Sequence, residues 1–241
     1  MSGHSKWSQI KHKKGISDVK KGKIFSKLAR IITIAARDKG GNPQTNSSLR
    51  LAAEKARSFN MPQENIERAI KKGLGEIEGV KFEDFLIEAY GPEGVALIIE
   101  GLTDNKNRTI SEIKYLFSEH NGKLAQSGSV LWLFERRGQI IIPRGTQTKE
   151  ELELAAIDAG AEDLNWVDEE NLEIYTKPED LEKTKKNLEK NNLPISEASL
   201  VWSPKNKIKL TGEKSREQLE KLLDDLDEHD DVNEIYSNQE D

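Results

Sequence analysis

GQIIIPRGTQTKEELELAAIDAGAEDLNWVDEENLEIYT, residues 138–176, alternates strand-like and helix-like segments in a fixed order. Its helical part carries apolar residues from Leu152 to Ala159, and a second helix is expected after Pro178. Flanking and intervening apolar segments predict strands at 139–142, 162–167, 172–176 and 195–202. The order strand, helix, strand, strand, helix, strand is that of the ferredoxin-like unit. We therefore expect a ferredoxin-like α+β domain over residues 137–204.

The segments on either side of this unit predict one more α+β domain. Upstream, strands are expected at 82–90, 95–102 and 129–135, with a helix at 105–119. Downstream lie a short strand (207–210), a helix with leucines from Leu219 to Leu226, and a strand (232–236). Because a strand–helix–strand tail cannot form a stable sheet alone, we expect it to complete the upstream sheet. This predicts a discontinuous domain of residues 78–136 plus 205–238, into which the ferredoxin-like domain is inserted.

Helical periodicity dominates the first 77 residues. Helices are expected at about 22–37, 48–59 and 63–72, and the Gly40–Pro43 stretch ends the first of them. The predicted fold class is α+β with three domains: a small helical domain at 1–77, then two α/β-sandwich domains with antiparallel sheets.

Charge is segregated along the chain. Residues 1–75 contain 17 Lys or Arg and 5 Asp or Glu, a balance of +12, whereas the remainder has a balance of −18. This separation indicates that the N-terminal part binds a polyanion, and nucleic acid is the polyanion whose regularly spaced phosphates suit Lys and Arg along one face.

The cations form an arm and a helical stripe. The arm, residues 4–14, has no acidic residue and includes Trp7, which could stack on a base. On the first helix, at 100° per residue, the basic side chains occupy one stripe beside the apolar one. The predicted nucleic-acid-binding residues are His4, Lys6, Trp7, Lys11, His12, Lys13, Lys14, Lys20, Lys21, Lys23, Lys27, Arg30 and Arg37.

Two alternatives to this interpretation stay open. The stripe could be a solvated face, and the second and third helices could be a helix-turn-helix. The third helix begins with Glu64 and Glu67, which is unlike a base-reading helix. Asp104 is expected to cap the helix at 105–119, while the loop before it could complete a groove. Possible secondary contacts are Arg68, Lys71, Lys72, Lys106 and Arg108.

Catalytic and metal-binding patterns are weak. The chain has no cysteine, its four histidines are scattered, and no phosphate-binding glycine loop or nucleophile turn is present. Acidic pairs such as Asp230-Asp231 are interpreted as solvation. We expect no enzyme activity, no cofactor, no metal, no small-molecule substrate and no membrane segment. The expected location is cytoplasmic, with bacterial cytoplasm and organelle both left open.

Several motifs resemble those of the YebC family over essentially the whole chain. They are Gly3-His4-Ser5-Lys6-Trp7 with Ile10–Lys14, Lys21–Lys27, Asn60-Met61-Pro62, Asn65–Ile70, Tyr90-Gly91-Pro92 and Leu102-Thr103-Asp104-Asn105. Departures from the family pattern are Glu93 for Gly, Gly101 for Cys and Asn42 for Asp.

The resemblance implies a helical first domain, two α+β domains and a non-enzymatic role in gene expression. Members of this family are described as DNA-binding transcriptional regulators or as translation factors, including translational activators and ribosome-associated proteins that relieve stalling. Few base-reading groups accompany the cations, which favours structured RNA. We therefore expect a translation factor that contacts rRNA or tRNA on the ribosome, and a regulator that binds double-stranded DNA is the alternative.

Overall fold

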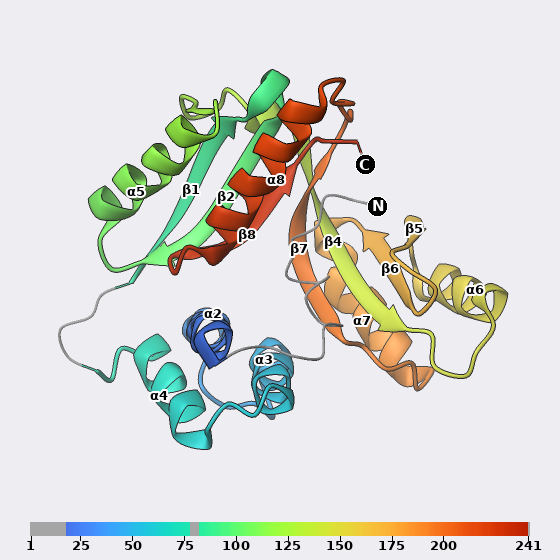
Figure 1. The fold of residues 1–241 in the computed structure, drawn as a ribbon. Coiled ribbons are helices and arrows are strands. Elements are labelled where there is room, and N and C mark those ends of the chain that lie inside the picture. Colours follow the sequence, from blue (N-terminus) through green and yellow to red (C-terminus); the bar gives the residue numbers. More distant parts are fainter. Residues whose placement is uncertain (1–17, 78–81, 241) are drawn as a thin grey trace. The chain divides into compact units, whose positions relative to one another are not determined.

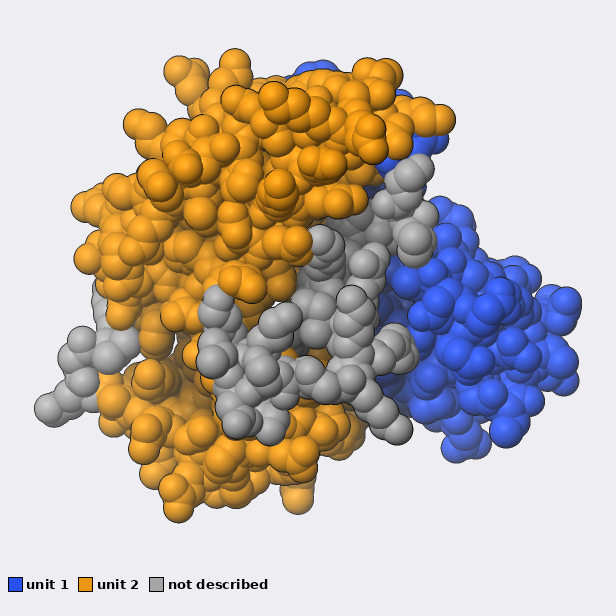
Figure 2. Space-filling model, in the orientation of Figure 1, with its two compact units in different colours: residues 1–3, 132–207, 240–241 blue, residues 4–131, 208–239 orange. Residues whose placement is uncertain are grey.

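The computed structural model describes residues 18–77 and 82–240. The chain divides into two compact units (Figure 2). One is built on residues 132–207, and the other combines the described residues before 132 with residues 208–239. The second unit contains both the helical segment and the first of the two sheets (Figure 1).

From residue 18 to residue 77, the structure describes three helices: α2 (Asp18–Lys39), α3 (Ser47–Ser58) and α4 (Gln63–Gly73). Their apolar faces meet in a core that includes Leu28, Ile32, Leu49 and Ile66. Asn46 caps α3 by accepting a hydrogen bond from the Leu49 amide, as short polar side chains do at helix starts. The three helices expected from periodicity are thus present.

Close contact between α2 and α4 depends on Gly73. A Cβ at this position would lie 2.3 Å from the Thr33 carbonyl oxygen. Thr33 Oγ1 also donates to the Ala69 carbonyl at 3.0 Å, so the two helix backbones approach without a side chain between them. Absence of a Cβ therefore allows this pair of helices to pack.

The first sheet is antiparallel, with the order β3-β1-β2-β8. Its strands are β1 (Glu83–Tyr90), β2 (Ala96–Thr103), β3 (Lys123–Leu124) and β8 (Val232–Ser237). Helices α5 (Lys106–Glu119) and α8 (Glu213–Glu228) cover one face of this sheet (Figure 1). Leu97 pairs with Ser237 and Ile99 with Ile235, so the C-terminal strand returns to the upstream sheet as expected.

The second sheet, in the 132–207 unit, has the order β5-β6-β4-β7. All its pairings are antiparallel, and α6 (Lys149–Ala159) and α7 (Leu181–Lys190) pack on one face around Ile140, Leu152 and Leu188. The chain order and strand order together are those of a ferredoxin-like fold. Its strands are β4 (Phe134–Pro143), β5 (Asp163–Trp166), β6 (Asn171–Thr176) and β7 (Glu197–Pro204).

The fold class predicted from the sequence is confirmed, with the ferredoxin-like domain inserted into the α+β domain. The domain boundaries stay predictions. Some individual elements differ from expectation. Residues 131–133 form a short 3₁₀ helix (η2), and one strand, β4, replaces the two expected at 129–135 and 139–142. Around 207–210 there is a single bridge between Ile208 and Gln239.

Short 3₁₀ turns connect several elements. η1 (Pro92–Gly94) joins β1 to β2, and η3 (Pro178–Asp180) leads into α7. Within η1, Glu93 has a φ of 52°, a left-handed conformation that Gly adopts more readily. Its carboxylate accepts hydrogen bonds from the amides of Thr211 and Gly212, both at 3.1 Å, immediately before α8. The Glu93 side chain thereby fixes the start of a helix whose N-cap residue, Gly212, has no side chain.

Candidate functional site

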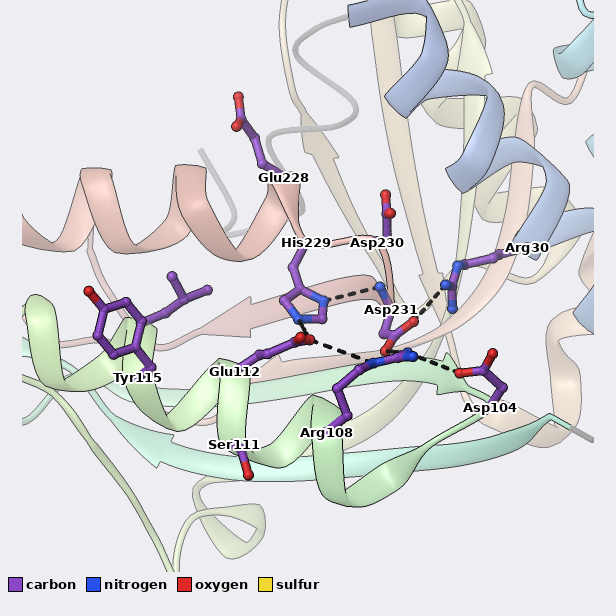
Figure 3. Close-up of a pocket in the computed structure, with 11 residues that line it drawn as sticks. Arg30, Asp104, Arg108, Ser111, Glu112, Tyr115, Glu228, His229, Asp230 and Asp231 are labelled. Atoms are coloured by element: carbon purple, nitrogen blue, oxygen red, sulfur yellow. Dashed lines mark hydrogen bonds and ion pairs between the residues drawn. The ribbon is translucent and has the colours of Figure 1, made fainter. Parts of the chain in front are cut away.

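Three segments distant in the sequence meet at Asp231. Arg30 comes from the middle of α2, Arg108 from the first turn of α5, and Asp231 from the turn between α8 and β8 (Figure 3). Thr109 follows Arg108 on α5. A β-bulge between Glu100 and Gly101 shifts the register of β2 against β8 here. The turn can approach β2 because a Cβ on Gly101 would lie only 2.0 Å from the Asp231 carbonyl oxygen.

The Asp231 carboxylate is saturated by donors. Its Oδ1 lies 2.6 Å from Arg30 Nη2, and its Oδ2 lies 2.8 Å from Arg108 Nη2. The hydroxyls of Thr109 and Thr103 donate to Oδ2 at 2.5 Å and 3.1 Å. The side chain is only 2% exposed, which is tolerable for a charge that is paired and hydrogen-bonded. Arg30 also donates to the Leu102 carbonyl.

These contacts determine the protonation state of Asp231. Burial alone would raise the pKa of the carboxyl. Hydrogen bonds from Thr109 and Arg108, together with the charge and hydrogen bond of Arg30, outweigh burial and lower this pKa to about 2. Asp231 therefore remains ionised near neutral pH. It acts as a fixed negative charge that positions two arginines, and not as a general acid or base.

The Leu102–Asn105 stretch builds one side of this site. Asn105, not Asp104, caps α5: its side chain accepts from the Arg108 amide at 3.2 Å. The expectation that Asp104 is the cap is therefore wrong. Asp104 instead pairs with Arg108 at 3.0 Å, because Asn105 is the residue with extended backbone immediately before the first helical turn.

Next to Asp231 lies an open pocket of about 820 Å³ (Figure 3). Five of its lining residues are carboxylates and two are arginines, so its wall is acidic and disfavours phosphate. His229 closes one side and lies 3.1 Å from Glu112. The lining residues are Arg30, Asp104, Arg108, Ser111, Glu112, Tyr115, Leu116, Glu228, His229, Asp230 and Asp231.

Metal binding finds no support in the parts of the chain that the structure describes, where no group of three or more His, Asp or Glu side chains could hold an ion. His120 is paired with Asp225 at 2.7 Å, distant in sequence from the His229–Glu112 pair. Over the same residues, no helix is long and apolar enough to cross a membrane.

Comparison with known proteins assigns the family. A model described as the TACO1/YebC N-terminal domain matches residues 5–76, and one described as the TACO1/YebC second and third domain matches residues 82–239. The chain belongs to the TACO1/YebC family.

Relatives in this family match over nearly their whole length. A "Probable transcriptional regulatory protein" of Halothermothrix orenii is 50% identical over 241 residues, which covers 99% of this chain and 94% of the relative. One of the same description from Thermotoga maritima is 52% identical, with 99% and 93% covered. The crystal structure of a conserved hypothetical protein from Aquifex aeolicus superposes with a TM-score of 0.86 at 48% identity, covering 98% of this chain and 97% of that one.

Much of the predicted nucleic-acid interface of this TACO1/YebC protein lies outside the described residues. His4, Lys6, Trp7, Lys11, His12, Lys13 and Lys14 all precede residue 18, where the description begins. Lys20, Lys21 and Lys23 belong to α2, but the structure describes only their backbone. The assignment of these residues to nucleic-acid binding stays a prediction.

The three remaining predicted cations of α2, Lys27, Arg30 and Arg37, are called the basic stripe below. Each makes an ion pair with the α+β domain. Lys27 Nζ lies 2.7 Å from Asp227 Oδ1, and Arg37 Nη2 lies 2.9 Å from Asp84 Oδ2. Arg37 also pairs with Asp38 at 3.1 Å. Asp84, Asp227 and Asp231 therefore form a matching set, which we call the acidic edge.

The possible secondary contacts lie on α4 and in the first turn of α5. Arg68 and Lys71 are exposed on α4, and the Lys72 ammonium lies 5.8 Å from the centre of the Phe82 ring. Lys106 is exposed at the start of α5. Arg108 is directed at Asp231 and Asp104, and these partners raise its pKa.

Sequence reasoning missed Asp231 and its threonine partners. It assigned Asp230-Asp231 to solvation, which the structure supports for exposed Asp230 but not for Asp231. The sequence contains only a weak indication of this cluster. Asp231 directly precedes a predicted strand, and Thr103 and Thr109 lie on either side of a predicted helix start. No regular sequence spacing connects the aspartate with the two threonines.

Proposed function

We propose that this protein is a non-enzymatic, nucleic-acid-binding regulator of gene expression that acts as a translation factor on the ribosome. The observation that carries the proposal is the charge segregation, +12 over residues 1–75 against −18 over the remainder. Phosphate contacts depend on such concentrated cations and supply most of the affinity of a non-specific or shape-dependent binder.

Regulation of gene expression is supported by the relatives, which carry the description "Probable transcriptional regulatory protein" at about half-identical sequence. The acidic start of α4 in the helical segment supports RNA, and not DNA, as the target. This helix begins with exposed Glu64 and Glu67, a poor surface for reading bases in the major groove of DNA. Shape-dependent contact with an RNA backbone does not need such a helix.

Ribosome binding is also compatible with the acidic α+β domains. The carboxylates beside the 820 Å³ pocket would repel a wrapped nucleic acid, so we expect these domains to contact protein or to remain outside the nucleic-acid path. In this arrangement the residues before α3 provide phosphate contact, and the rest of the chain sets the position of the factor.

Crosslinking in cells, followed by sequencing of the bound nucleic acid, tests the proposal. We expect reads concentrated on rRNA or tRNA, and sedimentation of the protein with ribosomes at low salt. Failure to sediment with ribosomes at any salt concentration would exclude the translation-factor role.

A second candidate is a regulator that binds double-stranded DNA, and the description of the relatives as probable transcriptional regulatory proteins favours it. It predicts that a promoter fragment is bound about 10³-fold or more tightly than competitor DNA. Equal binding to all DNA sequences would exclude this candidate.

A further inference from the structure

We propose that the acidic edge is an intramolecular mimic of nucleic-acid phosphates that occupies the basic stripe, so that polyanion binding must displace it. This inference rests on the proposed function, because the stripe is one of the surfaces predicted to bind phosphate. It adds that the protein regulates its own access to nucleic acid.

The ion pairs follow the stripe along α2. Lys27, Arg30 and Arg37 each have a carboxylate partner in the acidic edge, at 2.7 Å, 2.6 Å and 2.9 Å between the nearest N and O atoms. Residues 27 and 30 are one helical turn apart on α2, and their partners lie at the end of α8 and in the turn that follows it. The acidic edge thus presents one carboxylate to each cation of the stripe, as phosphates would.

Burial makes the two uses of the stripe mutually exclusive. The Lys27 side chain is 9% exposed and that of Arg30 is 18% exposed, while their partners Asp227 and Asp231 are 15% and 2% exposed. A phosphate cannot reach these two cations while the carboxylates cover them. Arg30 also donates a hydrogen bond to the Leu102 carbonyl.

Separation of the two surfaces would leave each apolar core intact. The helical core around Leu28 and Ile66 and the sheet core around Ile99 and Phe117 form distinct clusters with no residue in common. The Arg37–Asp84 pair is the accessible one, with side chains 31% and 64% exposed, so added salt and competing polyanions weaken this pair first. Residues 74–82 connect α4 to β1 and provide the covalent tether between the two surfaces.

A protein whose binding-competent state is only partly populated shows a reduced apparent affinity. Weakening the acidic edge should therefore strengthen nucleic-acid binding, even though the substitution lies in a different domain from the cations. An ion pair that only stabilises the fold would not strengthen nucleic-acid binding when it is removed.

Binding of a fluorescein-labelled RNA hairpin by the full chain tests the proposal. Asp227→Asn removes one acidic-edge charge, and Glu217→Gln, at an exposed site on the same helix, makes the same charge change away from the stripe. We expect Asp227→Asn to bind about five-fold or more tightly than Glu217→Gln, a coupling of typical size. Equal affinities for the two variants, with measurable binding, would overturn this inference but leave the proposed function intact. Absence of binding by wild type and both variants would overturn both.

A distance measurement keeps the test independent of variant stability. The chain has no cysteine, so Glu54→Cys on α3 and Glu220→Cys on α8 give two specific spin-label sites, both exposed and outside the ion pairs. We expect pulsed dipolar spectroscopy to show a new distance population when the RNA hairpin is added. An unchanged distribution with RNA bound would contradict displacement of the acidic edge.

Discussion

Arg30 and Asp231 are 201 positions apart in the sequence, and their charged atoms lie 2.6 Å apart in the structure. This pair joins the most basic segment of the chain to the turn that leads into its last strand. Because Asp231 also accepts from Arg108, Thr109 and Thr103, one carboxylate connects α2, β2, α5 and β8.

Asp231→Asn should destabilise the protein by about 2–4 kcal/mol, because it leaves two arginines beside a buried, uncharged side chain. Chemical denaturation of the full chain measures this change. Asp230→Asn is the matched control at the neighbouring, exposed position and should alter the free energy of unfolding by less than about 0.5 kcal/mol. Equal effects of the two substitutions would contradict the role assigned to Asp231.

The same carboxylate predicts a pH dependence. The folded-state pKa of about 2 lies below the ordinary value of 3.8, so ionised Asp231 stabilises the fold above that ordinary value. This contribution, on the order of 1–2 kcal/mol, should be lost as the pH falls from about 4 to about 2. The difference in free energy of unfolding between wild type and Asp231→Asn should shrink over this range. A difference independent of pH would argue against an ionised Asp231.

Glu88 should control the order of the loop that precedes β4. Its carboxylate accepts from the amides of Gly128, Val130 and Leu131 at 2.5 Å, 2.6 Å and 2.9 Å. Burial by itself would raise the pKa of Glu88, but the three amides outweigh it and lower that pKa.

For Glu88→Gln, we expect faster hydrogen exchange at these three amides and a loss of about 1–3 kcal/mol, since an amide side chain replaces a charged acceptor. Glu83→Gln, at an exposed position on the same strand, is the control. Unchanged protection of the three amides in Glu88→Gln would show that the carboxylate is dispensable.

Glu93 stabilises the fold through its side chain and destabilises it through its backbone conformation. Its side chain binds the amides before α8, while its φ of 52° is unfavourable for any residue with a Cβ. Glu93→Ala loses the hydrogen bonds and keeps the strained backbone, whereas Glu93→Gly loses the hydrogen bonds and relieves the strain. The melting temperature should therefore be lowest for the Ala variant, with the Gly variant closer to wild type. A Gly variant less stable than the Ala variant would contradict this account.

Local patterns were enough to predict most of the fold. Helical periodicity gave α2, α3 and α4, and the argument that a strand–helix–strand tail needs a sheet placed β8 beside β2. Errors occurred where distant hydrogen bonds override local preference. The apolar residues 130–133 suggest a strand, but the amides of Val130 and Leu131 bind Glu88, and a 3₁₀ turn follows.

The site was harder to predict than the fold. The spacing predicts Lys27 and Arg30 as nucleic-acid-binding cations, but spacing along α2 cannot reveal carboxylates two hundred residues away. Asp231 resembles the exposed acidic residues around it until its neighbours are placed in three dimensions. Composition therefore indicates a nucleic-acid-binding segment, whereas the pairing of that segment depends on the tertiary structure.

The salt dependence of RNA binding tests the central claim most directly. Wild type and a variant with Lys6, Lys11, Lys13 and Lys14 changed to Gln are titrated with the same RNA hairpin over a range of KCl concentrations. If these lysines contact phosphate, the variant should bind more weakly, and its slope of log K against log salt should be smaller in magnitude by about 3–4. An unchanged affinity and slope would contradict the account that the basic N-terminal segment binds nucleic acid.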